Sequence, residues 1–417
     1  MNDYTVLSIA QQSRFASRQL SATPASTRNL ALAKMAEALA SAKAQVLAVN
    51  AQEVMKARDE GQSEALVQRL TIDDKTFQYM LSRLQKVAQL PDPLNRILAG
   101  HTNANGLKVC KKSVPLGVIG IIYESRPNVT TDAAAVCIKS GNAVILRGGS
   151  EALQTNTLLT DAMIAGAVSA GLPAHAIQII RTPGHEAVGE LLGMDAYIDV
   201  LIPRGGKGLI KRIAEGTRIP VIKHYDGVCH LYIAADAKPE QAIALAVNSK
   251  CQSVQVCNAL ETLLVDKACA EQLLPQLHTA FAAQHIELRG CVQTQQLLPT
   301  IPAATEADWH SEYLAPILSV KIVDGLQAAI DHINHYGSGH TDGIVTQSLA
   351  MAQQFEAQVD SASVMINAST RLSGGGDYGL GSVVGISTDK LHVRGPVGPD
   401  ELTSYKWVAY GDGHLRA

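Results

Sequence analysis

Short runs of isoleucine and valine recur between longer alanine- and leucine-rich stretches, and this alternation constrains the fold more than any other feature. In the first series the runs lie at 117–123, 143–147, 176–181, 198–203 and 219–222. Runs of this length without polar alternation are typical of parallel strands that are buried on both faces. The sequence therefore predicts a doubly wound α/β domain whose ligand lies beyond the carboxyl ends of its strands.

A second series begins after 231–234, with runs at 245–248, 262–265, 317–323, 343–346 and 363–367. We interpret it as a second α/β unit. Residues 5–90 carry apolar positions at helical spacing and predict a helical layer that ends at Pro91 and Pro93. Asn105-Gly106 separates two short alternating runs and predicts a hairpin with a type I′ turn, in which both central residues need positive φ.

The overall composition excludes several classes of protein. The chain has 417 residues, enough for two or more domains, and a net charge of -3 without basic or acidic blocks. This balance argues against nucleic-acid and membrane-surface partners, and no apolar run reaches the ~18 residues of a membrane span. The N-terminus lacks the pattern of a signal peptide, so we expect a cytoplasmic protein whose partners are small molecules or copies of itself. Seven cysteines without C-x-x-C pairs argue against disulfides and structural zinc.

Cys257 stands between a polar run, 248–255, and an apolar segment that starts near Leu260. The polar run has no helical period, so we expect a loop there. A cysteine at such a junction can present Sγ to a cleft while its backbone N–H donates to an oxyanion. The alternative is a small buried hydrophobic residue, which is what most free cysteines are.

Polar residues follow the first apolar run, at the carboxyl end of the expected strand. The guanidinium of Arg126 is a fork for a carboxylate or a phosphate, and the amide of Asn128 can point at an oxyanion. The alternative is an ordinary strand-to-helix turn with an exposed arginine.

Glycines and basic residues close two further runs. Arg147 and Gly148 follow the run at 143–147, and Gly205 and Gly206 open a helix after 198–203, where N–H groups suit an anion. There is no G-x-G-x-x-G, so the glycines alone do not establish a dinucleotide site. The stretch 224–230 is dense in His, Cys and Asp but lacks metal-ligand spacing, and we expect no metal.

Several strings, taken together and in order, resemble the γ-glutamyl phosphate reductase family, a branch of the aldehyde dehydrogenase superfamily. They are VPLGVIGIIYESRPNV at 114–129, GNAVILRGG at 141–149, CNALETLL at 257–264, NASTR at 367–371, KLHVRGP at 390–396 and YKW at 405–407. The resemblance implies an aldehyde-dehydrogenase-like α/β fold. It implies a Rossmann-like cofactor domain at 1–98 and 115–231, to which part of 367–400 returns, and a catalytic domain at 232–366. A small β arm, made of a hairpin at 99–114 and a strand at 401–417, would join copies into a homo-oligomer.

The resemblance also assigns roles to residues. It makes Cys257 the nucleophile and pairs Asn128 with the Cys257 N–H as the oxyanion hole. It places the cofactor, NADPH, against Arg147, Gly148, Gly205, Gly206 and Glu312, with Arg147 near the adenosine ribose and Glu312 at the nicotinamide ribose. It leaves Arg126, Arg371 and His224 as candidates for substrate or phosphate.

The activity implied is the NADPH-dependent reduction of L-glutamate 5-phosphate to L-glutamate 5-semialdehyde, through a Cys257 thioester, in proline biosynthesis. Hydrolytic aldehyde dehydrogenases carry a water-activating glutamate in a Glu-Leu-Gly-Gly-Lys string, and this chain has His224-Tyr-Asp-Gly there. A hydrolytic aldehyde dehydrogenase is the first alternative. The second is a catalytically inactive nucleotide-binding partner protein, because Ser253-Val254 stands where the family has Arg-Pro. The lability of the acyl phosphate also suggests an association with glutamate 5-kinase.

Overall fold

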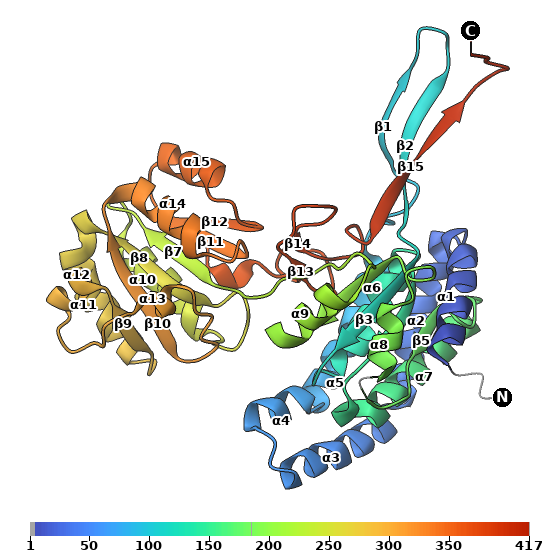
Figure 1. Ribbon diagram of the computed structural model, residues 1–417, viewed down its shortest axis with the longest axis horizontal. Coiled ribbons are helices and arrows are strands. Elements are labelled where there is room, and N and C mark those ends of the chain that lie inside the picture. Colours follow the sequence, from blue (N-terminus) through green and yellow to red (C-terminus); the bar gives the residue numbers. More distant parts are fainter. Residues whose placement is uncertain (1–4, 185, 417) are drawn as a thin grey trace. The chain divides into compact units, whose positions relative to one another are not determined.

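The computed structural model describes residues 5–184 and 186–416, which form two compact units (Figure 1). Unit 1 contains the described residues up to Lys223, Gly379–Ile386 and those from Val397 onward; unit 2 contains His224–Tyr378 and Ser387–Pro396. The predicted division after residue 231 is wrong, because it cuts strand β7 (Cys229–Ile233), which is bonded on both sides within unit 2. Among the described residues, no helix is both long and apolar enough to cross a membrane.

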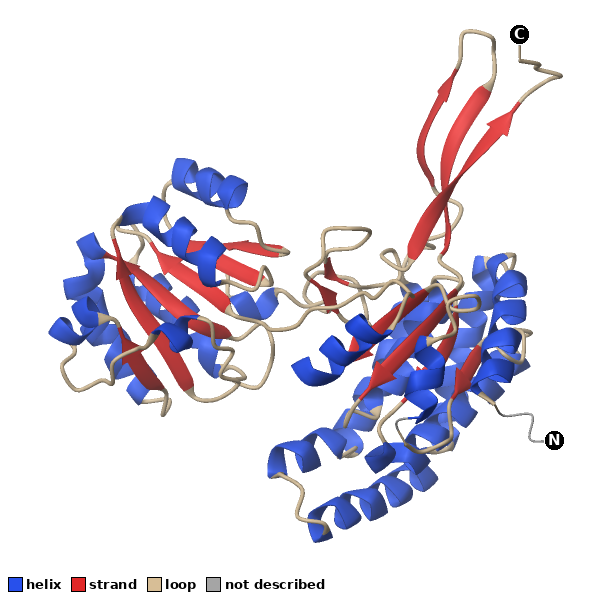
Figure 2. Ribbon diagram, in the orientation of Figure 1, coloured by secondary structure: helices blue, strands red, loops and turns tan. Residues whose placement is uncertain are grey.

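A four-stranded parallel sheet forms the centre of unit 1, in the order β5-β4-β3-β6 (Figure 2). Its strands are β3 (Val118–Tyr123), β4 (Ala143–Arg147), β5 (Ile177–Ile179) and β6 (Val200–Arg204), and its helices are α6 (Asn128–Lys139), α7 (Leu153–Ser169), α8 (Glu186–Leu192) and α9 (Lys207–Gly216). Every residue of β3 and β4 is buried, as their unbroken apolar runs predict. The expected fifth strand is reduced to one bridge between Val221 and Leu201.

Five helices build the N-terminal layer of unit 1: α1 (Val6–Ser21), α2 (Ala25–Ser41), α3 (Lys43–Asp59), α4 (Glu64–Leu70) and α5 (Asp74–Gln89). Asp73 caps α5 by accepting from the Thr76 N–H at 2.7 Å, and the helix ends before Pro91, as predicted. Helix α2 packs closely on α7, because a Cβ added to Gly166 would lie 2.5 Å from the Met35 backbone.

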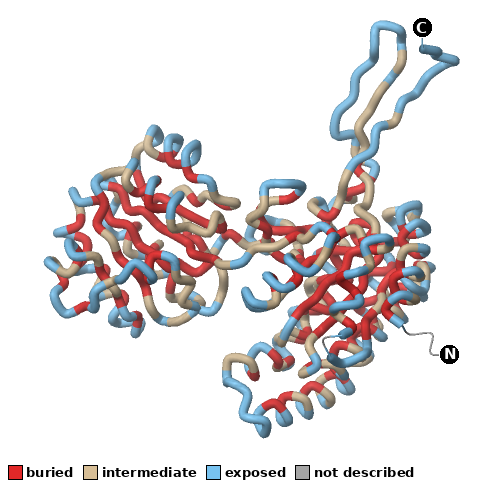
Figure 3. The backbone as a smooth tube through the Cα atoms, in the orientation of Figure 1, coloured by how far each residue is buried: buried red, intermediate tan, exposed pale blue. Residues whose placement is uncertain are grey.

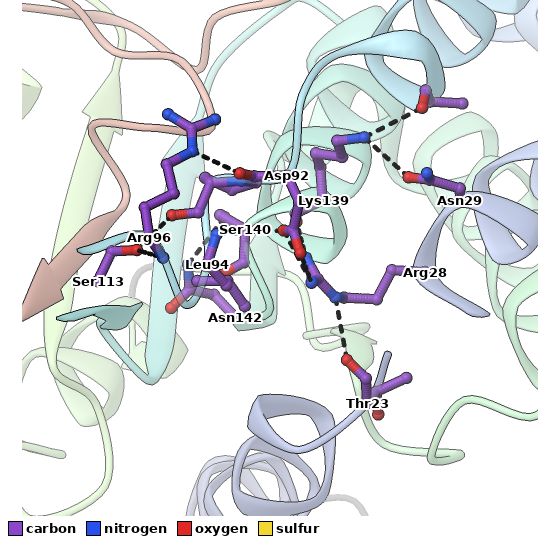
Figure 4. A network of polar contacts seen from close by, with 12 residues as sticks. Thr23, Arg28, Asn29, Asp92, Leu94, Arg96, Ser113, Lys139, Ser140 and Asn142 are labelled. Atoms are coloured by element: carbon purple, nitrogen blue, oxygen red, sulfur yellow. Dashed lines mark hydrogen bonds and ion pairs between the residues drawn. The ribbon is translucent and has the colours of Figure 1, made fainter. Parts of the chain in front are cut away.

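Two buried cations tie this layer to α6 (Figure 4). Arg28 donates to both carboxylate oxygens of Asp92, at 2.9 and 3.0 Å, and to the carbonyl of Lys139. The Lys139 Nζ donates to Asn29 at 2.8 Å and to the carbonyl of Ala88 at 3.0 Å. Burying a charged group is costly unless it is paired or hydrogen-bonded, so these contacts favour one position of α6 against the N-terminal helices.

The predicted arm is a three-stranded antiparallel sheet of β1 (Ile97–Thr102), β2 (Lys108–Pro115) and β15 (Thr403–Tyr410), with β2 in the middle. Figure 3 shows that most of it is exposed. The expected type I′ turn is wrong, because Gly106 has positive φ (89°) and Asn105 does not. The Gly106 N–H instead donates to the carbonyl of Asn103 at 2.9 Å, which makes Gly106 the last residue of its turn.

Unit 2 is built on a six-stranded parallel sheet in the order β12-β11-β7-β8-β10-β9. Besides β7, its strands are β8 (Leu260–Asp266), β9 (Glu287–Gly290), β10 (Ile317–Val323), β11 (Thr341–Val345) and β12 (Ser363–Ile366). Its helices are α10 (Pro239–Cys251), α11 (Lys267–Ala282), α12 (Val292–Leu297), α13 (Glu306–Trp309), α14 (Gly325–Tyr336) and α15 (Leu349–Gln358). Two short strands, β13 (Ile386–Ser387) and β14 (Gly395–Pro396), pair with each other.

The run at 245–248 is not a strand but part of α10, and the polar stretch from residue 248 is helical as far as Cys251. The helix buries the small side chains of Ala242, Ala246 and Ser249, which follow helical spacing. Because these side chains are small and only weakly apolar, the helical period is hard to see in the sequence.

Candidate active site

Cys257 lies on a short loop between α10 and β8, as its position in the sequence predicts. Its side chain is partly exposed. The loop is fastened at both ends by an ion pair between Lys250 and Glu261, whose Nζ and Oε2 atoms lie 2.6 Å apart with both side chains buried. The loop therefore presents the thiol from a firmly anchored stretch of backbone.

Two imidazoles face this thiol. The ligand atoms of His224, Cys257 and His340 all lie within 4.8 Å of one another, and the two rings pack edge to face at 5.4 Å. His340 is 1% exposed, its Nδ1 lies 2.8 Å from the Thr341 hydroxyl, and its Nε2 has no hydrogen-bond partner among the described residues. Burial lowers the pKa of His340 to about 4, so this imidazole is neutral at pH 7.

The backbone of Gly227 lies directly against the Cys257 loop. A Cβ added to Gly227 would overlap the Cys257 carbonyl, so only glycine fits. The Gly227 N–H donates to Oε1 of Glu312 at 3.0 Å, which places Glu312 beside the thiol loop. The Cys229 thiol donates to the same Cys257 carbonyl at 3.2 Å, and burial raises the pKa of Cys229 well above its usual value. Cys229 is thus a structural thiol.

These groups gather at the amino-terminal edge of the second sheet. Cys257, His340 and Glu312 precede strands β8, β11 and β10, and residues 224–228 lead into β7. The order β11-β7-β8-β10 makes those strand starts neighbours. Of the residues that the sequence predicts for the site, Cys257, His224 and Glu312 lie in this group. His340 and Gly227 were not predicted, because only the strand order brings them to the thiol loop.

Arg371 supplies a cation to the same loop. Its Nε donates to Gln252 at 2.9 Å, and its carbonyl accepts from the Asn258 side chain at 3.3 Å. Burial lowers the pKa of Arg371, and the charge of Cys257 opposes that shift. Arg371 therefore stands by the loop in which Ser253-Val254 replaces an expected arginine and proline.

Arg126 and Asn128 share a pocket of about 190 Å³ within unit 1. The pocket lies at the carboxyl ends of β3 and β6, the edge at which the sequence predicted a ligand. Its lining combines three arginines, one carboxylate, an amide, a phenol and three valines: Tyr79, Arg83, Arg126, Asn128, Val129, Asp132, Arg204, Val383 and Val384. Arg83, Asp132 and Arg204 were missed; Asp132 lies one helical turn after Asn128, which was a usable signal.

Two of the cofactor residues expected in unit 1, Arg147 and Gly148, lie in closely packed surroundings. The side chain of Arg147 is 7% exposed and donates to the carbonyls of Gly148 and Gly184, while its Nε has no partner among the described residues. Gly148 is required by packing, since a Cβ there would overlap Asn156. Arg147 is therefore occupied mainly in holding its own loop.

The start of α9 already holds an anion. Gly206 is the N-cap of this helix, and its N–H donates to Oε2 of Glu124 at 3.2 Å, while a Cβ on Gly205 would overlap the same carboxylate. The carboxylate occupies the kind of position that a phosphate oxygen takes at a helix N-terminus. The glycines thus fit a cofactor phosphate, provided that Glu124 gives way to it.

Comparison with known proteins identifies the family and the fold of the chain. The aldehyde dehydrogenase family matches residues 2–296 and 298–379. A γ-glutamyl phosphate reductase from Thermotoga maritima is 37% identical with a TM-score of 0.96, and the match covers 99% of this chain and 100% of that one. The γ-glutamyl phosphate reductase from Saccharomyces cerevisiae is 29% identical with a TM-score of 0.55, over 99% and 98% of the two chains.

A more distant structure shares the fold alone: an acetylating aldehyde dehydrogenase from Geobacillus thermoglucosidasius is 20% identical with a TM-score of 0.70, over 99% of this chain and 97% of that one. The family match spans most of the chain, and the Thermotoga maritima enzyme matches it from end to end. The chain belongs to the aldehyde dehydrogenase family and, within it, to the γ-glutamyl phosphate reductases.

Proposed function

We propose that this protein reduces L-glutamate 5-phosphate to L-glutamate 5-semialdehyde with NADPH and releases phosphate, as a step of proline biosynthesis. The observation that carries the proposal is the full-length match at 37% identity to a γ-glutamyl phosphate reductase. The partly exposed thiol of Cys257, set beside two imidazoles, supplies the chemistry that this reaction needs.

In the proposed mechanism Cys257 Sγ attacks the acyl carbon of the substrate, the bond from that carbon to the phosphate oxygen breaks, and a thioester forms. The amide of Asn128 and the backbone N–H of Cys257 stabilise the oxyanion; removing one such donor typically costs on the order of 10²–10³ in rate. The thioester would be reduced by a hydride, which is the chemistry that bound NADPH would supply. Cys257 then leaves as a thiolate and the aldehyde is released.

The two imidazoles take different parts. His340 is neutral at pH 7, so its Nε2 can accept a hydrogen bond from the thiol and orient it, but it does not store a proton. His224 is the candidate for handing a proton to phosphate or to the hemithioacetal. Arg371, which is hydrogen-bonded to Gln252 and Asn258 around the Cys257 loop, is the candidate cation for the departing phosphate.

Each unit by itself carries candidate groups for the cofactor. In unit 1 the N–H groups of Gly205 and Gly206 would bind its phosphates, and Arg147, near Gly148, would favour the 2′-phosphate of NADPH. In unit 2 Glu312 would bind the nicotinamide ribose. Its carboxylate is held beside the thiol loop by Gly227.

The assembly and location of the protein are part of the same proposal. The arm exposes Ile97, Leu98, Tyr405 and Trp407, which suits pairing with another copy in a homo-oligomer. We assign the protein to the cytoplasm. Association with glutamate 5-kinase follows from the lability of the acyl phosphate.

The proposal is tested in the reverse direction, with glutamate 5-semialdehyde and NADP⁺ in the presence and absence of inorganic phosphate. Reduction of NADP⁺ should require phosphate and should disappear in the Cys257→Ser variant. The Cys269→Ser variant, which changes a thiol that is hydrogen-bonded to the Asp266 carbonyl, should remain active. Equal reduction without phosphate would establish a hydrolytic aldehyde dehydrogenase instead. No reduction under any condition would favour a catalytically inactive nucleotide-binding protein.

A further inference from the structure

Three donor atoms that suit a soft metal ion lie together within unit 2. They belong to His224, Cys257 and His340, and all of them lie within 4.8 Å of one another. Each residue comes from a different segment: the stretch before β7, the loop before β8 and the position before β11. Spacing along the chain therefore did not predict a metal site, whereas the strand order β11-β7-β8 makes these segments neighbours.

The buried imidazole of His340 is the observation that points to a ligand. Its side chain is 1% exposed, and its Nε2 has no hydrogen-bond partner among the described residues. A polar nitrogen that is buried without a partner carries a cost in free energy. A ligand that bonds to this nitrogen would remove that cost.

A chain of buried hydroxyl groups determines which nitrogen of His340 carries the proton. The Ser373 hydroxyl donates its one proton to the carbonyl of Thr370 at 3.0 Å. The Thr341 hydroxyl lies 2.8 Å from that of Ser373, so it must donate to Ser373 and accept from the His340 Nδ1, which is also 2.8 Å away. Neutral His340 then keeps its lone pair on Nε2. Metal-binding histidines have this arrangement, in which the other nitrogen donates to an outer partner.

The donor set selects the kind of metal ion. One sulfur and two imidazole nitrogens are ligands of Zn²⁺ and similar ions, whereas Mg²⁺ and Ca²⁺ prefer oxygen. In a tetrahedral zinc site such donors lie about 3.3–3.6 Å apart. Donors that lie within 4.8 Å of one another reach this spacing by side-chain adjustments on the order of 1 Å. Three protein ligands leave the fourth position to water.

We infer that His224, Cys257 and His340 form a binding site for Zn²⁺ or a similar divalent ion, and that the bound ion holds the enzyme inactive. As the bond from the metal to Sγ forms, the thiol releases its proton to solvent, and nothing is oxidised or reduced. Any hydrogen bond that a donor atom makes is exchanged for the bond to the metal. The site therefore does not require donors that lack partners.

The ion and the substrate compete for the same sulfur atom. A thiolate is both the nucleophile and the metal ligand, and a thioester of Cys257 has no thiolate to offer. Acylation therefore excludes the ion, and the bound ion prevents attack on the acyl carbon. Only this inhibitory role rests on the proposed function; the binding of the ion does not.

Co²⁺ tests the site directly, because a thiolate bound to it gives a charge-transfer absorption band without any turnover. Titration of the full-length protein should produce this band with about one equivalent of Co²⁺ per chain, and Zn²⁺ should displace it. Cys257→Ser should abolish the band, whereas Cys251→Ser, at the end of α10, should keep it. The inference is overturned if the wild-type protein gives no band, or if the band survives in Cys257→Ser.

The role of the hydroxyl chain is tested with Thr341→Val, which keeps the branched shape of the side chain but removes the group that accepts from His340. This variant should bind Co²⁺ about 10–100-fold more weakly, the usual cost of losing an outer partner of a metal ligand. The matched control is Thr262→Val in β8, because the Thr262 hydroxyl is also buried but has no hydrogen-bond partner among the described residues. Its affinity should not change. Equal affinities of the wild type and both variants would remove His340 from the site and overturn the inference.

The order of addition separates the metal site from the proposed function. Protein that is first incubated with glutamate 5-semialdehyde and NADP⁺ without phosphate should give no band with Co²⁺, and phosphate should restore the band by releasing the thioester. A full band on the acylated enzyme would contradict the inhibitory role. A wild-type protein that gives the band but never reduces NADP⁺ would retain the metal site and lose the proposed function.

Discussion

Lys250 and Glu261 form an ion pair with an Nζ–Oε2 distance of 2.6 Å, and neither side chain is exposed. One residue lies in the last turn of α10 and the other in β8, so the pair brackets the loop that carries Cys257. Burial raises the pKa of Glu261 to about 7 and lowers that of Lys250, so each charge depends on the other. Positioning of the thiol is therefore coupled to the integrity of this pair.

Replacing only one partner of this ion pair should lower the free energy of unfolding far more than replacing both partners. Lys250→Met or Glu261→Gln alone should lower the free energy of unfolding by ~3–5 kcal/mol, because each leaves an unpaired buried group. The double variant should recover much of that loss. Urea unfolding of the four proteins measures the coupling, and strictly additive losses would show that the two residues act independently.

Zinc should inhibit the enzyme by binding to Cys257, His224 and His340. A thiolate and two imidazoles are preferred Zn²⁺ ligands, and their donor atoms here lie within 4.8 Å of one another. Micromolar Zn²⁺ should slow both turnover and alkylation of Cys257 by iodoacetamide, and a chelator should reverse both effects. His340→Ala should raise the half-inhibitory Zn²⁺ concentration on the order of tenfold or more, whereas the exposed His175→Ala should not change it. Equal sensitivity of both variants would show that zinc acts elsewhere.

Acidification should destabilise unit 2 through His332. This residue of α14 is buried, its Nδ1 lies 3.1 Å from the Lys321 Nζ, and burial lowers its pKa to about 2. Because the folded pKa lies below the unfolded value near ~6.5, the stability it contributes is present above that pH and is lost as pH falls toward about 2.

Each such proton changes the free energy of unfolding by about 1.4 kcal/mol per pH unit. His332→Gln should therefore flatten the dependence of stability on pH by about that amount below pH 6. Urea unfolding between pH 7 and 5 measures it. Parallel curves for the two proteins would mean that His332 is protonated in the folded state.

The arm should hold copies of the chain together. Ile97 and Trp407 are 66% and 59% exposed, on strands that flank β2. The Ile97→Ser/Trp407→Ser variant should reduce the mass measured by light scattering to that of one chain, since covering a large apolar side chain contributes ~1.5–3 kcal/mol. Leu391→Ser, at an exposed leucine outside the arm, is the control. A wild-type protein that already has the mass of one chain would contradict the assignment.

The sequence predicted the strands and the loop position of Cys257 because their signals are local. The apolar runs at 117–123 and 262–265 coincide with the buried strands β3 and β8, and Cys257 stands on the loop that leads into β8. The run at 245–248 was misassigned, because a short apolar segment fits a buried helix as well as a strand.

The surroundings of the thiol could not be predicted in the same way. His340 and Gly227 reach Cys257 only because β11, β7 and β8 are neighbours, and strand order is not encoded in any one of them. The pocket lined by Arg126 and Arg204 lies at the carboxyl ends of its strands, where a ligand is expected in α/β sheets. Cys257 and His340 lie at the opposite end of their sheet, because they precede their strands.

The Cys257 thioester is tested most directly by the amount of NADPH that forms when enzyme, glutamate 5-semialdehyde and NADP⁺ are mixed rapidly without phosphate. We expect a burst of about one equivalent per active Cys257, after which the reaction stops with the thioester in place and resumes when phosphate is added. Continuous turnover without phosphate would contradict it, because water rather than phosphate would then resolve the thioester.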